Sequence, residues 1–156
     1  MRNNYTDYVP FEIGVKLKKA GYWKPRCTYE SSYNDPCYII NSKKFYVDGV
    51  VAPWGDIVPA PTYAEVFDWF ASEKHIVITL EPFHTFALQE RIGYTWKIAY
   101  PDYELGKLVI KSEEDEWDSS KCFGGSFKLT ANEAIENAMT ITVKPEEFIE
   151  VDINDL

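Results

Sequence analysis

The chain has 156 residues, of which 46% are hydrophobic and 26% are charged, and its formal net charge is -9. This length predicts one domain or two small subdomains, and the composition excludes disordered, collagen-like and low-complexity chains. The excess of 25 acidic over 16 basic residues argues against direct binding of nucleic acid, because non-specific affinity for DNA or RNA depends on cationic groups that neutralise phosphates.

The sequence favours a cytoplasmic location. Met1–Pro10 has neither the apolar core nor the small-residue cleavage site of a secretory signal, and no run approaches the ~20 apolar residues of a membrane-spanning helix. The three cysteines, Cys27, Cys37 and Cys122, form an odd set without C-x-x-C spacing, so we expect reduced thiols. A Cys27–Cys37 disulfide is geometrically conceivable, and the sequence leaves it open.

The first predicted element in chain order is a helix from about Phe11 to Ala20. Ile13, Leu17 and Ala20 recur at helical spacing, and Gly21 follows as a stop signal. Three lysines near its C-terminal end stabilise this helix, because their positive charges lie near the negative end of the helix dipole.

A β-hairpin is predicted next, with strands at 36–40 and 44–47, and a strand at 26–29 can join it. Helix and hairpin together form a predicted N-terminal unit over residues 1–51, which is small and should rely on the second half for its core. Residues 52–61 contain three prolines, which do not continue a helix or a central strand, and we interpret them as an extended connector.

Residues 62–145 predict an α-β-β-β-α unit with an antiparallel sheet. The capping box Thr62-x-x-Glu65 opens a helix that ends near Lys74. The three strands are predicted at 75–80, 92–100 and 105–111. A second capping box, Thr130-x-x-Glu133, is predicted to open the final helix, which Pro145 ends.

The overall prediction is an α+β fold in which the N-terminal helix and hairpin pack on this unit. The acidic tail, residues 146–156, follows it. Ile149, Val151 and Ile153 alternate with polar or acidic residues, so the tail either forms an edge strand or stays disordered until a partner binds.

The run PAPTYAEVFDWF at residues 59–70, followed by Glu73-Lys74-His75, resembles a passage shared by small uncharacterised proteins encoded in Bacteroidetes genomes and prophages. Trp96, Tyr100 and the run Ala134-Ile135-x-x-Ala138 match later parts of those proteins, so that the resemblance covers about two-thirds of the chain. It implies an α+β fold and a mobile-element origin. The family carries no assigned activity, so the resemblance implies no catalytic residues.

The residues with catalytic chemistry are few. His75 and His84 are the only side chains that titrate near neutral pH when unperturbed, and their spacing matches no zinc motif. Cys122 precedes the Gly124-Gly125 loop, which lacks the Lys-Ser/Thr ending of a phosphate-binding loop. We therefore predict no catalytic residue, metal or cofactor, and keep a small enzyme with a site near His84 and Cys122 as an alternative.

The candidate interaction residues are acidic and aromatic. Exposed Tyr and Trp favour protein interfaces because they bury a large rigid area at low entropic cost. The carboxylates at 113–118 either imitate the phosphates of a nucleic acid or belong to a solvated loop. The leading hypothesis is a non-enzymatic accessory factor that binds an unknown protein partner. A homo-oligomeric structural protein is the other alternative. The candidate interaction residues are Glu113, Glu114, Asp115, Glu116, Trp117, Asp118, Trp23 and Tyr22.

Overall fold

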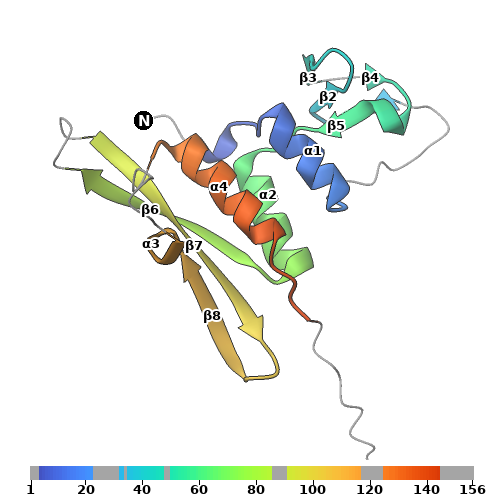
Figure 1. Cartoon of the computed structure of the whole chain (residues 1–156). Helices are drawn as coiled ribbons and strands as arrows, with labels where there is room; N and C mark the ends of the chain where they lie inside the picture. The colour runs from blue at the N-terminus through green and yellow to red at the C-terminus, as the bar shows by residue number, and fades with distance from the viewer. Residues whose placement is uncertain are drawn as a thin grey trace, which may run out of the picture.

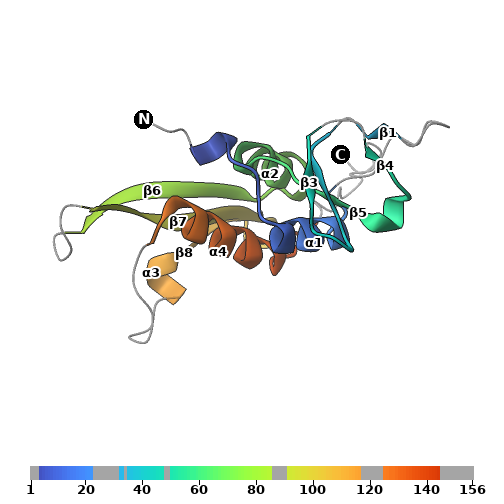
Figure 2. The ribbon, with the colours of Figure 1, turned by 90° about the horizontal axis from the view of Figure 1, so that it is seen from above.

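The computed structural model describes residues 4–22, 32–33, 35–47, 50–85, 91–116 and 125–144. The fold is α+β, as predicted from the sequence. Successive layers run from a long three-stranded antiparallel sheet through two helices to the N-terminal helix and a second, smaller sheet (Figure 1). Figure 2 shows the same succession from above.

The N-terminal part contains one α-helix and several short strands. In chain order these elements are η1 (Asn4–Thr6), α1 (Phe11–Lys19), β1 (Ser32–Tyr33), β2 (Cys37–Ile39), β3 (Phe45–Tyr46), β4 (Val50–Val51), η2 (Trp54–Asp56) and β5 (Ile57–Pro59). The predicted helix and hairpin are confirmed, because β2 and β3 pair antiparallel. The strand predicted at 26–29 lies outside the described residues.

The proline-rich connector is part of a sheet, which the sequence reading missed. β5 pairs antiparallel with β2 and completes the strand order β3-β2-β5. Pro59 is tolerated because β5 is an edge strand, where a missing N–H leaves no ladder bond unmade. Lys18 of α1 fixes this segment further, since its Nζ donates to the carbonyl oxygens of Trp54 and Ile57 at 2.6 and 2.7 Å.

The second half has the predicted order of helix, three antiparallel strands and helix. Its elements are α2 (Tyr63–Trp69), the π-helical turn η3 (Phe70–Lys74), β6 (Val77–Thr85), β7 (Arg91–Asp102), β8 (Lys107–Ser112), the single turn α3 (Glu113–Glu116) and α4 (Phe127–Met139). The long sheet has the order β6-β7-β8. Figure 1 shows α2 and α4 together on one side of this sheet.

The two predicted capping boxes have different outcomes. At α2 the box is present: Glu65 N donates to Thr62 Oγ1 and the Glu65 carboxylate accepts from Thr62 N. At α4 the prediction is wrong, because Ser126 is the N-cap and accepts from Leu129 N at 3.3 Å. Thr130 instead lies buried inside the helix, where its hydroxyl donates to the Tyr94 carbonyl of β7 at 3.0 Å.

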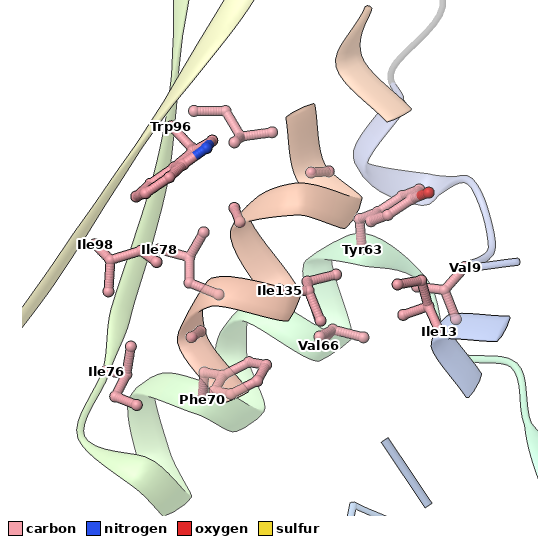
Figure 3. Packing of buried hydrophobic residues seen from close by; sticks show 14 of the residues in the cluster. Val9, Ile13, Tyr63, Val66, Phe70, Ile76, Ile78, Trp96, Ile98 and Ile135 are labelled. Carbon is pink, nitrogen blue, oxygen red and sulfur yellow. The ribbon is translucent and has the colours of Figure 1, made fainter. Parts of the chain in front are cut away.

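A single main core joins the long sheet, both helices and the N-terminal segment (Figure 3). Trp96 and Ile98 lie on the face of β7 that packs against the helices, and both side chains are fully buried. Ile13 and Leu17 of α1 belong to the same cluster, so the N-terminal helix packs on the second half, as expected.

Among the described residues, none of the helices combines the length and apolar character that crossing a bilayer requires.

Candidate functional site

The two faces of the long sheet differ in what covers them. Residues of even number in β7, such as Trp96 and Ile98, face the helices and the core. Their odd-numbered neighbours face the opposite way, because side chains alternate along a strand. Ala99 pairs with Val77 on one side and with Ile110 on the other, and Pro101 pairs with Leu108.

These five residues form what we call the outer patch: Val77, Ala99, Pro101, Leu108 and Ile110. Val77 is 51% exposed, and Leu108 and Ile110 are each 60% exposed. An antiparallel sheet with one solvated face normally carries polar residues on that face. The outer patch departs from this pattern at one end of the sheet.

The other end of the same face follows the usual pattern. Thr79 pairs with Lys97, and Glu81 pairs with Thr95. Lys97 Nζ lies 3.2 Å from the Glu81 carboxylate, with both side chains about half exposed. The outer face is therefore divided into an apolar end and a polar end.

The β7–β8 turn borders the apolar end. Asp102 Oδ1 accepts from the backbone N–H groups of Glu104 and Leu105, both at 3.1 Å, and Gly106 closes the turn at a φ of 63°. Leu105 is 65% exposed at its tip. Lys144, just after α4, reaches the Glu104 carboxylate at 2.8 Å, so the chain after α4 passes beside this turn.

β8 is an edge strand. Among the described strands it pairs with β7 alone, so it lies at an edge of the long sheet, as β6 does at the other edge. Lys107, which opens β8, is exposed and forms no hydrogen bond or ion pair within the described part of the chain.

A second candidate is a groove of about 470 Å³ between the end of η3 and the segment that follows α4. Trp69, His75, Met139 and Val143 are among the residues that line it. His75 adopts a left-handed φ of 57°, and π-helical turns are frequent at functional sites.

Both features of this groove also have a structural explanation. A left-handed residue commonly closes a helix, and the N–H of Ile76 donates back to the carbonyl of Phe70 at 3.0 Å. The His75 ring forms no hydrogen bond with any described residue, so none of these residues orients it as a general base.

The acidic run at 113–118 is not uniformly exposed, contrary to what a solvated strip would require. Glu113 is only 7% exposed. Glu114 and Asp115 are exposed, and the backbone N–H of Asp115 donates to Ser112 Oγ at 3.3 Å, which starts the α3 turn. The backbone of Glu116 completes this turn, and Trp117 and Asp118 lie outside the described residues.

Of the two predicted aromatic interaction residues, the structure describes only Tyr22. Tyr22 is half-buried and packs against the main core, with its ring centroid 5.2 Å from that of Trp69 in an edge-to-face arrangement. Burial, with smaller contributions from Glu65 and Asp35, raises the pKa of Tyr22. Trp23 lies outside the described residues.

Of the two residues of the enzyme alternative, the structure describes only the backbone of His84. His84 is a backbone partner of Ile92 in the β6–β7 ladder, and Cys122 and Gly124 lie outside the described residues, as does Cys27. Cys37 is fully buried, and burial followed by Asp35 raises the pKa of its thiol, which disfavours the nucleophilic thiolate. In the ranges that the structure describes, no three His, Cys, Asp or Glu side chains gather as a metal site needs.

Comparison of the chain with protein-family models, with curated proteins and with solved structures found no match.

Sequence reasoning found the strand at 105–111 but missed the outer patch. Leu108, Val109 and Ile110 are consecutive apolar residues between Lys107 and Lys111, so alternation does not reveal which of them face the core. The register with β7 shows that Leu108 and Ile110 lie on the outer face and that Val109 lies on the opposite face. A run of three apolar residues in a strand is itself the signal that both faces carry apolar side chains.

Proposed function

We propose that this protein is a non-enzymatic binding module that docks another protein on the outer patch. The observation that carries the proposal is the pair Leu108 and Ile110, each 60% exposed on the face of the sheet opposite the core. Contiguous apolar surface of this kind, bordered by polar residues, is typical of protein interaction sites. The polar end around Glu81 and Lys97 supplies such a border.

The resemblance of residues 59–70 to proteins of Bacteroidetes genomes and prophages supports a bacterial or phage protein as the partner and an accessory role for this chain. The net charge of -9 supports a partner with a basic surface around its apolar contact, because complementary charge accelerates encounter and suppresses wrong partners.

The test is site-specific photo-crosslinking in cell extract from the source of the gene. A benzophenone amino acid at position 110 should capture one defined protein. The same group at Thr79, on the polar end of the same face, is the matched control and should capture much less of it. Equal capture at both positions, or none at position 110, would contradict the proposal.

The captured protein then allows a quantitative test. Burying an aliphatic side chain contributes about 1.5–3 kcal/mol, so Leu108→Lys or Ile110→Lys should weaken binding by about tenfold or more. Thr79→Lys should leave the dissociation constant unchanged within a factor of two or three. Loss of binding in Thr79→Lys alone would place the interface elsewhere.

The two alternatives give different results in the same experiments. A homo-oligomeric structural protein would crosslink at position 110 to a second copy of itself and show a concentration-dependent mass in light scattering. An enzyme with a site near His84 and Cys122 would show no preferred capture at position 110, and its turnover of a substrate would be lost in the His84→Ala and Cys122→Ala variants.

A further inference from the structure

The helices α1, α2 and α4 lie side by side and run in the same direction (Figure 1). At one end, the first residues of α2 and α4, Tyr63 and Phe127, have ring centroids 5.7 Å apart. Toward the other end, Lys16 Nζ of α1 lies 2.6 Å from the carboxylate of Glu136 in α4, and both residues come one turn before the end of their helix. The C-terminal ends of the three helices are therefore at the same end of the molecule.

The groove of about 470 Å³ lies at this common end. Its lining includes Ala20, which is the C-cap of α1, the η3 turn that continues α2, and Met139, the last residue of α4. Each helix C-terminus carries a partial negative charge of about half an elementary charge, which favours a cation nearby. α4 has no basic residue in its last turn, so its own side chains do not compensate this charge. The helix ends therefore give the groove a negative potential.

The side chains of the groove agree with this preference for a cation. Glu73 and Lys74 line it with opposite charges, and His75 counts as neutral at pH 7, so the helix ends determine the sign of the potential. Lys74 Nζ lies 5.4 Å from the centroid of the Trp69 ring, which is within the range of a cation–π interaction, and Trp is the best aromatic partner for a cation. The chain thus already places one of its own cations on the aromatic ring that lines the groove.

We propose that this groove binds a small organic cation, an alkylated ammonium ion whose methyl groups contact Trp69 and Met139. The volume of the groove is within the range of about 300–1,000 Å³ that is usual for small-molecule sites. A lysine ammonium group is compact and strongly hydrated, whereas an alkylated ammonium ion loses less hydration on entering an aromatic site, so it can displace Lys74 from the ring. The site is formed by the helices and does not depend on protein docking at the outer patch.

Titration of the full chain with choline, followed by amide and indole NMR signals, tests the proposal. The signals of the Trp69 indole and the Thr142 amide should shift and saturate. The neutral isostere of choline, in which a tert-butyl group replaces the trimethylammonium group, should bind at least about threefold more weakly. A trimethyllysine residue blocked at both ends carries the same head group, and the tighter of the two cations shows whether the natural ligand is free or part of a protein. No saturable shift with either cation, or equal affinity for the neutral isostere, would overturn the proposal.

Two substitutions at exposed positions of the groove should change the affinity for choline in opposite directions. Lys74→Met removes the competing cation from the Trp69 ring and should tighten binding about two- to fivefold. Thr142→Lys adds a positive charge to an exposed residue of the lining and should weaken binding by a similar factor. Thr79→Lys, the same change on the outer face of the long sheet, is the matched control and should leave the dissociation constant unchanged. Binding that is not tightened in Lys74→Met, or equal effects of Thr142→Lys and Thr79→Lys, would overturn the proposal.

Discussion

Gly14 lies in α1 at the point where this helix crosses the edge strand β5. A Cβ added at this position would lie 2.8 Å from Val58 Cγ1 and closer still to the Pro59 carbonyl oxygen. Real Cβ contacts are not this short, and one of the two atoms is rigid backbone. Gly14→Ala can therefore be accommodated only if α1 moves away from β5.

The cost of this movement competes with a gain in helix propensity. Overpacking of a well-packed contact costs about 1–3 kcal/mol, and an exposed Gly→Ala change within a helix gains about 1 kcal/mol. Gly14 is fully enclosed, and the same helix contributes Ile13 and Leu17 to the main core, so the displacement also loosens buried contacts. We expect Gly14→Ala to destabilise the protein by about 1–2 kcal/mol net.

Urea unfolding followed by tryptophan fluorescence measures this change as a lower midpoint with an unchanged m-value. Gly55→Ala is the matched control, because an added Cβ there meets nothing within 4 Å, and we expect a change within about 0.5 kcal/mol. A Gly14→Ala variant that is more stable than the natural sequence by the propensity gain would refute the reasoning, since it would show that α1 and β5 are not in close contact.

Three further predictions concern stability. Burial raises the pKa of Tyr63 to about 12 from its ordinary value of 10.0, so the unfolded chain loses this proton first, and Tyr63 should contribute about 3 kcal/mol to the fall in stability between about pH 10 and 12. Tyr63→Phe should reduce that fall in urea melts by about this amount, since Tyr22 with its raised pKa still contributes; an unchanged fall would contradict the assignment. Ser126→Ala should cost about 1 kcal/mol as the true N-cap of α4, whereas Glu133→Ala should cost less than about 0.5 kcal/mol; the reverse order in thermal melts would restore the predicted capping box. Lys18→Met should cost about 2 kcal/mol, because the carbonyl oxygens of Trp54 and Ile57 lose a charged donor; an unchanged urea midpoint would show that these bonds add nothing.

Local signals predicted the parts of the fold that local interactions determine. The capping box at Thr62 and the helical spacing that follows it were sufficient for α2, since both ends of the box lie within one turn. In the strand predicted at 92–100, the apolar residues Trp96 and Ile98 alternate with Thr95 and Lys97, which agrees with the burial of every second residue in β7.

The errors arose where a distant residue decides between two local options. Thr130 and Ser126 are both acceptable N-caps by sequence, and the Tyr94 carbonyl, 36 residues away, takes the Thr130 hydroxyl. In the same way, Ile57 and Pro59 belong to a strand only because β2 provides the pairing edge. Neither contact can be predicted from the neighbouring residues in the sequence.

The exposed aliphatic residues of the outer patch would favour contact between two copies of the chain. Two copies each carrying a net charge of -9 repel each other over the whole surface, and this long-range term opposes the short-range gain from burying Leu108 and Ile110. A partner of opposite charge gains from both terms. Ionic strength therefore distinguishes the two kinds of assembly: added salt screens the repulsion and strengthens self-association, but it weakens binding to a basic partner.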